Sequence, residues 1–164
     1  MHPPEGAAWL VALETSGFAQ AMRHWLWLYP IVEIVHILGF VLLVGAAVMF
    51  DLRLLGVSSR IPVSDLARHL LPWSRVGLGL VAPSGVAMFS AHATEWIANP
   101  AFWVKLSLIA LAGVNAGVFH RWTFRSVATW DRHATAPAAA RASAVASLAL
   151  WVGVVTCGRL LAYL

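Results

Sequence analysis

The stretch from Tyr29 to Gly56, YPIVEIVHILGFVLLVGAAVMFDLRLLG, constrains the fold more than any other part of the chain. No residue between Ile34 and Phe50 carries a formal charge, and a helix needs about 20 apolar residues to cross a bilayer core of ~30 Å. Glu33 and His36 nevertheless lie in this run, one helical turn apart on the same face. An ionisable side chain at membrane depth normally faces the interior of a bundle. The stretch therefore predicts a membrane-spanning helix that needs partner helices.

The composition also favours a membrane protein. Of the 164 residues, 60% are hydrophobic and 11% are charged, whereas soluble domains have about 25% charged residues. Basic loops at a membrane surface explain the net charge of +4 better than nucleic-acid binding does, so we expect no nucleic-acid partner. The single cysteine, Cys157, excludes an internal disulfide. We expect one membrane domain over residues 1–164 and no cleaved signal peptide, because the first arginine is Arg23.

The apolar runs predict an all-α fold, a four-transmembrane-helix bundle. Its spans cover about residues 29–55, 70–95, 101–122 and 142–162. Pro72 and Pro83 are expected to kink the second span. Residues 1–24 are mixed in character and predict an N-terminal segment of one or two short interfacial helices, the second capped by Ser16.

The basic residues predict an orientation. Arg53, Arg60, Arg68 and Arg75 accompany the first loop between spans, Arg121, Arg125, Arg132 and Arg141 accompany the third, and the other side has only Arg23, Lys105 and Arg159. Loops that face the cytoplasm carry an excess of Lys and Arg. Both arginine-rich loops are therefore expected to be cytoplasmic, which gives an N-out/C-out, multi-pass protein of the bacterial inner (cytoplasmic) membrane.

Four histidines are the candidate site residues. In this orientation His36 and His92 lie at comparable depth in the outer half of the bundle, and His69 and His120 lie at comparable depth near its inner side. Two imidazoles that face each other across a bundle are the ligands of a bis-histidine b-type haem. These four side chains are also the candidate metal ligands, although a histidine at a helix end is often an ordinary interfacial residue.

Other polar residues fit around such a cofactor. Glu33 is placed to hydrogen-bond the free ring nitrogen of His36. Lys105 and Arg159, near the outer surface, are candidate partners of haem propionates. Simple packing of helices explains the small residues around Lys105 equally well.

Helix geometry limits the number of haem groups. His69 and His92 are separated by roughly 35 Å along a straight helix and by about 140° around its axis. Two haems at that distance would exchange electrons poorly. His120 lies roughly 15 to 20 Å deeper than His36. The expected cofactor is one or two haem b groups, and a single haem on the outer pair or on His36 and His120 stays open.

Several segments carry a family resemblance: YPIVEIVHILG with DLRLLG downstream, LPWSRVGLGLVAPSGVAMF, NPAFWVKLSLIALAGVNAGVFH and SLALWVGVVTCGR. Over nearly its whole length the chain resembles an uncharacterised family of small bacterial four-helix membrane proteins. The architecture is also loosely similar to that of four-helix b-type cytochromes and CopD-type copper-resistance proteins. The resemblance implies no activity. It implies that the family-type positions are Glu33, His36, Asp51, Arg53, Asn99, Phe102, Lys105, Asn115, His120 and Arg159, and not His69 or His92.

Three functions stay open. The first is a b-type haem protein that transfers electrons, with membrane lipid, a quinone and a redox-partner protein as expected partners. The second is a copper-handling transport or accessory protein, with Glu33, His36 and Met49 or Met88 as contacts. The third is a cofactor-free scaffold subunit of a larger membrane complex; a homo-oligomer is also open. The sequence has no phosphate loop and no nucleophile–base pattern, so an enzyme of this kind would be a membrane oxidoreductase.

Overall fold

The computed structural model describes residues 7–131, 135–161 and 163, and the described part contains helices and loops but no strand. The predicted all-α fold class is confirmed. The elements in chain order are α1 (Ala8–Glu14), α2 (Gly17–His24), α3 (Leu28–Leu54), α4 (Val63–Ala91), α5 (Ala93–Ala98), α6 (Pro100–Arg121), the 3₁₀ helix η1 (Thr123–Thr129) and α7 (Ala138–Leu160).

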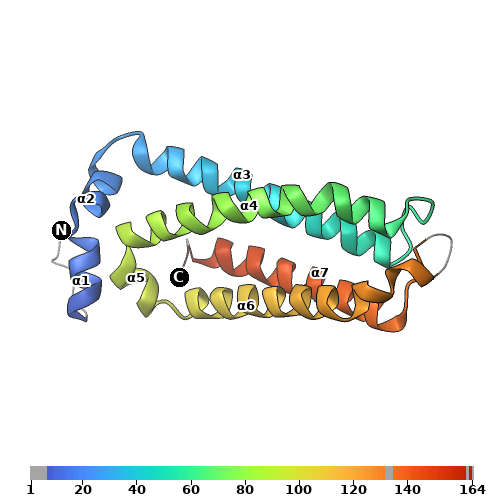
Figure 1. Ribbon diagram of the computed structural model, residues 1–164. Coiled ribbons are helices and arrows are strands. Elements are labelled where there is room, and N and C mark those ends of the chain that lie inside the picture. Colours follow the sequence, from blue (N-terminus) through green and yellow to red (C-terminus); the bar gives the residue numbers. More distant parts are fainter. Residues whose placement is uncertain (1–6, 132–134, 162, 164) are drawn as a thin grey trace.

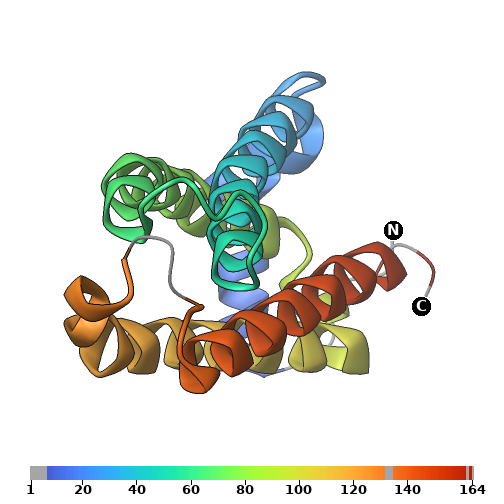
Figure 2. The same cartoon turned by 90° about the vertical axis from the view of Figure 1, so that its right-hand side faces the viewer.

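The four long helices form two antiparallel hairpins that lie side by side (Figure 1). α3 packs along α4, α6 packs along α7, and contact between α3 and α7 joins the two hairpins. In an end-on view α4 and α6 lie apart (Figure 2), and they are not among the helix pairs that pack together in the described residues. We call the end with α1, α2 and α5 the cap end, and the end with the loops after α3 and α6 the loop end.

Three of the long helices, α3, α6 and α7, are long and apolar enough to cross a membrane. Few of their residues are buried inside the isolated chain, as expected for helices whose apolar side chains face lipid. α4 is longer than α6 and α7 but is not among these three helices. Arg68 and Arg75 interrupt its apolar character. The structure thus indicates a multi-pass membrane protein with three candidate spans, and it does not clearly give the predicted four.

Close backbone approach holds α3 against α4. A Cβ atom on Gly77 would lie 2.6 Å from the carbonyl oxygen of Gly39 and 2.6 Å from the backbone nitrogen of Leu43. No side chain fits at these distances, and small residues are what allow membrane helices to approach so closely. This contact fixes the register of the hairpin.

Arg53 ties the loop end together. Its side chain is only 3% exposed. Its Nε donates to the carbonyl of Ile61 at 2.6 Å, and its Nη2 donates to the carbonyls of Ser59 at 3.1 Å and Asp131 at 3.4 Å. The Asp131 carboxylate accepts hydrogen bonds from the backbone N–H and the hydroxyl of Ser64, both at 2.8 Å, which satisfies one of the free N–H groups at the start of α4. The two loops of this end are therefore linked by one arginine and one aspartate.

The cap end contains the two short N-terminal helices that the sequence predicts. The Ser16 hydroxyl accepts a hydrogen bond from the N–H of Ala19 at 3.3 Å, so Ser16 caps α2 as expected. The Glu14 carboxylate accepts hydrogen bonds from the N–H of Thr94 at 3.0 Å and from its hydroxyl at 2.7 Å. Arg23 donates to the carbonyls of Ala91 at 2.7 Å and Glu14 at 2.6 Å. These bonds tie α1 and α2 to the junction of α4 and α5.

The boundaries of α4 differ from the predicted second span. The helix begins at Val63 and ends at Ala91, and Pro72 and Pro83 lie inside it. His92, with φ −140° and ψ 37°, separates α4 from α5. The sequence does not predict this break because neither Gly nor Pro marks it. α6 begins as proline rules expect, with Asn99 as its cap and Pro100 as its first residue.

Candidate functional site

His36 is half-buried on the face of α3 that packs against α4. Its Nδ1 lies 3.0 Å from the Oγ of Ser84. The Ser84 hydroxyl also lies 2.5 Å from the carbonyl of Leu80 and 3.2 Å from that of Val81. A carbonyl can only accept, so we assign the single hydroxyl proton of Ser84 to these acceptors. We therefore assign the ring proton to Nδ1, which donates to Ser84. This tautomer leaves a lone pair on the Nε2 of His36.

Gly85 provides the space that the ring of His36 occupies. A Cβ atom on Gly85 would lie 3.2 Å from Cε1 and 3.6 Å from Nδ1 of His36. A larger residue would push the ring away from α4 and stretch the hydrogen bond to Ser84. Two consecutive residues of α4, Ser84 and Gly85, thus fix both the tautomer and the position of the imidazole.

Lys105 brings the second hairpin to the same region. Its side chain runs from α6 toward α7, since a Cβ atom on Gly158 would lie 3.7 Å from its Nζ. The charge of Lys105 acts on the ring of His36. Among the described residues no carboxylate forms an ion pair with this lysine. Lys105, on the other hairpin, is therefore a partly buried cation whose charge acts on His36 and which forms no ion pair with a carboxylate among the described residues.

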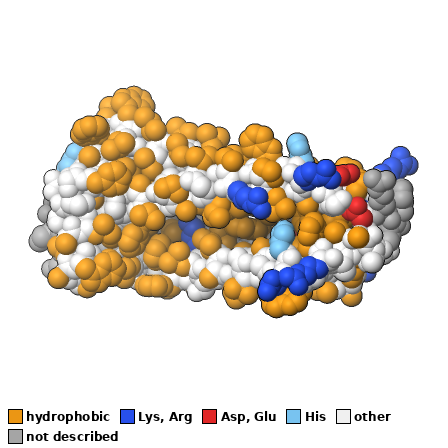
Figure 3. Space-filling view, viewed as in Figure 1, with side chains coloured by type: hydrophobic (Ala, Val, Ile, Leu, Met, Phe, Trp, Pro, Cys, Tyr) orange, Lys and Arg blue, Asp and Glu red, His pale blue; other side chains and the backbone are white. Residues whose placement is uncertain are grey.

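The space-filling view shows the surroundings of this region. Hydrophobic side chains cover most of the face in Figure 3, and the face is hollowed between the bands of α4 and α6. Most of its exposed charged side chains lie toward the loop end. The hollow coincides with the lack of packing between α4 and α6.

Glu33 does not take the role that its spacing suggests. It is exposed on α3, and its charge acts on His36 and on Tyr29. The ring nitrogen of His36 that Glu33 was expected to bind is bonded to Ser84 instead. The partner comes from the neighbouring antiparallel helix and not from the same helix.

The other candidate histidines lie in separate surroundings. His92 packs edge-on to Tyr29 with ring centroids 5.8 Å apart and stacks on Trp96 at 6.3 Å. His120 is exposed, with Nδ1 2.9 Å from the carbonyl of Ala116. His69 is exposed and lines a surface hollow with Asp65 and Arg68.

The described residues contain no ring contact between any two of these four histidines and no group of three or more His, Cys, Asp or Glu side chains able to hold a metal ion. The described contacts thus give His36, His92, His69 and His120 separate neighbours, and the pairing of these histidines as ligands stays a prediction. Arg159 is also apart from His36: it is exposed near the end of α7, where its guanidinium bonds to the hydroxyl of Tyr163.

A second polar group lies deeper in the bundle, toward the loop end. Asp51 is 6% exposed on α3, and Ser147 of α7 faces its carboxyl. One turn along α7, the Ser143 hydroxyl donates to the side-chain oxygen of Asn115, whose amide donates to the Ser143 carbonyl, both at 3.0 Å. Asp51 and Asn115 are both among the family-type positions that the resemblance implies.

Sequence reasoning did not identify Ser84 and Gly85. The signal was present in Pro83-Ser84-Gly85, a polar and small interruption of an apolar helix. The sequence analysis predicts only a kink at Pro83 from this interruption. Its alignment with His36 depends on the register of two helices, which no local pattern reveals.

Comparison with known proteins places the chain in a family without a known role. Residues 14–164 match the model of DUF6644, a family of unknown function. No curated protein and no solved structure matches the chain. The expected resemblance to an uncharacterised family is confirmed, and the looser similarity to b-type cytochromes and CopD-type proteins receives no support.

Proposed function

We propose that this chain, which belongs to the family of unknown function DUF6644, is a membrane-embedded haem b protein for electron transfer in which His36 would hold the haem iron. One observation carries the proposal. The bond to Ser84 holds the Nδ1 proton of His36, so that Nε2 is left with a lone pair. Histidines that bind a metal almost always donate their other ring N–H to a fixed acceptor in this way.

The surroundings of His36 suit an apolar, planar cofactor with acidic groups. Hydrophobic side chains cover most of the face in Figure 3, and this face is hollowed between α4 and α6, which are not among the helix pairs that pack together in the described residues. Lys105 has no carboxylate partner among the described residues, so its ammonium group is free to pair with a propionate. When bound, the haem supplies one-electron chemistry; the chain supplies the ligand, the hydrogen bond that orients it and the cation.

The described contacts bring no second histidine to His36. The proposal is therefore narrower than a bis-histidine site. One haem is bound per chain, with a single histidine ligand from the chain itself. Arg159 is not part of this site, because its guanidinium is engaged with Tyr163.

We further propose that all four long helices cross the bacterial inner membrane, with both termini outside. α4 has 29 residues and packs along α3, so it must lie at the same depth as α3 when α3 crosses. Arg68 and Arg75 lie in its loop-end half, from where long side chains can reach the membrane surface. The arginines near both loop-end turns favour a cytoplasmic loop end.

An absorption spectrum of the purified full-length chain tests the haem. After expression with a haem precursor and extraction into detergent, we expect a Soret band, an α band on reduction, and about one haem per chain. His36→Ala should lose at least nine-tenths of the bound haem at unchanged yield and elution volume. Ser84→Ala should keep part of the haem with a changed reduction potential, because the ring loses its fixed acceptor.

His69→Ala is the matched control, because His69 is exposed on α4 and should leave the spectrum unchanged. A colourless wild-type protein that also fails to take up added hemin would contradict the proposal. Full haem content in folded His36→Ala would do the same. Elemental analysis of the same preparation shows whether a colourless protein carries copper, the alternative cargo.

A further inference from the structure

Asp51 is a buried carboxylate with an incomplete set of partners. Its residue is 6% exposed, and its Oδ2 atom is buried without a hydrogen-bond partner among the described residues. The hydroxyl of Ser147, on α7, is the polar side chain that faces the carboxyl. A buried carboxylate that accepts so few hydrogen bonds is poorly compensated for the water it has lost.

The nearest polar residues along α7 do not supply the missing hydrogen-bond partners of Asp51. Ser143 and Asn115 satisfy each other through two hydrogen bonds of 3.0 Å, one in each direction. Their side chains are thereby committed to the α6–α7 contact. Asp51 is left with Ser147.

No cation neutralises Asp51 within the described contacts. Arg53, two residues along α3, directs its guanidinium to three backbone carbonyls. On α4, Arg68 is exposed and pairs with Asp65, and His69 is exposed. Besides α4, the helix that packs against α3 at this end is α7. The helix α2 packs against α3 at the cap end.

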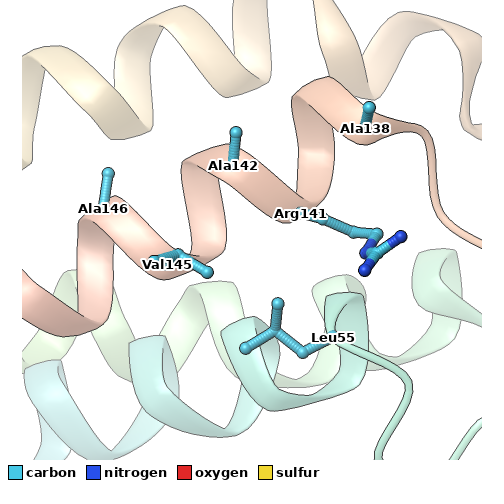
Figure 4. A pocket seen from close by; sticks show the side chains of 6 residues that line it. All are labelled: Leu55, Ala138, Arg141, Ala142, Val145 and Ala146. Atoms are coloured by element: carbon cyan, nitrogen blue, oxygen red, sulfur yellow. The ribbon is translucent and has the colours of Figure 1, made fainter.

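The charged residue of α7 on this side is Arg141. It lines a surface hollow together with Leu55, which follows the end of α3, and with four small or apolar residues of α7 (Figure 4). Its side chain extends beside Leu55 in that view. On α6, which reaches this level through Phe119, His120 is exposed and bonded to the carbonyl of Ala116. None of these groups forms an ion pair with Asp51.

We propose that Asp51 is a proton-binding site inside the membrane-embedded bundle, and that its carboxyl is protonated at neutral pH. An isolated carboxylate away from water is costly and becomes neutral by taking up a proton. Asp51 lies one turn before the end of α3, so a proton has a short path to the loop end. This site is separate from His36 and does not depend on a bound haem.

Carbodiimide labelling tests the protonation. Dicyclohexylcarbodiimide is an apolar reagent that attacks protonated carboxyls inside membranes: the acid proton moves to one carbodiimide nitrogen, the carboxyl oxygen bonds to the central carbon, and the adduct rearranges to a stable N-acylurea. With the full-length protein in lipid vesicles at pH 7, we expect peptide mass spectrometry to find the adduct on Asp51. The labelling should fall at least fivefold toward alkaline pH.

Substitutions of Asp51 distinguish labelling of this carboxyl from labelling of other carboxyl groups in the protein. Asp51→Asn should abolish this adduct, and Asp51→Glu should retain it. Asp65 is the internal control, because it is exposed and paired with Arg68, and it should stay unlabelled. If sodium chloride but not choline chloride reduces the labelling of Asp51 at constant pH, Asp51 binds a metal cation and the proposal is overturned.

An infrared measurement covers the case in which the reagent does not reach Asp51. The difference spectrum of wild type minus Asp51→Asn should contain the C=O stretching band of a protonated carboxyl at pH 7. Carboxylate bands in its place would overturn the proposal, whatever the labelling result.

Discussion

At the scale of a single residue, the Glu14 carboxylate links α1 to α5 at the cap end through its hydrogen bonds with Thr94. Burial raises the pKa of this carboxyl, but the two hydrogen bonds from Thr94 and the charge of Arg23 outweigh burial, and the pKa lies below its ordinary value of 4.5. A lowered pKa means that the state in which Glu14 contacts Thr94 favours the ionised carboxylate. The contribution of the Glu14 carboxylate to the stability of the cap end is fully present above pH 4.5 and is lost as the pH falls through the lowered pKa of Glu14.

We therefore expect α1 to detach from α5 in acid. Spin labels on Ala12→Cys and Ala98→Cys, in a Cys157→Ser background, report the distance between the two helices. The distance distribution should be narrow above pH 4.5 and broaden below it.

The variants make the cause of this change clear. Glu14→Gln should give a broad, pH-independent distribution, because an amide lacks the charge that Arg23 and Thr94 stabilise. Glu95→Gln, a change at an exposed carboxylate of α5, should keep the wild-type pH response. An unchanged pH response in Glu14→Gln would show that another group controls the docking.

At the scale of the elements, α3 and α4 approach most closely at Gly39 and Gly77. A Cβ atom on Gly77 would meet the backbone of Gly39 and Leu43 at 2.6 Å, and backbone atoms cannot move aside as a side chain end can. Gly77→Ala should force the helices apart and lower the free energy of unfolding by about 1 to 3 kcal/mol. Thermal unfolding in detergent, followed by circular dichroism, measures the change.

Gly79→Ala, on the same helix, is the matched control. Nothing lies within 4 Å of a Cβ atom at Gly79. Alanine is also the better helix former by roughly 0.5 to 1 kcal/mol, so this variant should be as stable as wild type or more so. Equal destabilisation by both substitutions would mean that the hairpin does not rely on close approach at Gly77.

At the scale of the whole molecule, the number of crossings decides where the termini lie. Four crossings place both termini on one side of the membrane, and three place them on opposite sides. Reporter fusions at each end of the full-length chain, one set active only outside and one only in the cytoplasm, distinguish the two cases. We expect outside activity at both ends, and cytoplasmic activity for a reporter inserted after Val57. A cytoplasmic C terminus would contradict the four-span proposal.

Much of the fold follows from local patterns. The apolar runs predict the four long helices, and Ser16 marks a helix start that the structure confirms. The break at His92 and the short α5 were missed, since the residues there have no strong helix-stopping character. The His36 side chain was found because an imidazole in an apolar run is unusual by composition alone.

Local patterns in the sequence predict which segments are helical, which apolar segments suit lipid and which polar side chains are costly there, because these properties depend on neighbours along the chain. The hydrogen bond of His36 with Ser84, the effect of the Lys105 charge on His36 and the contact of Asp51 with Ser147 are seen only in the folded chain. These contacts depend on the register between helices. That register is set by the close approach at Gly39 and Gly77 and by the packing of α3 on α7, which join residues far apart in the sequence.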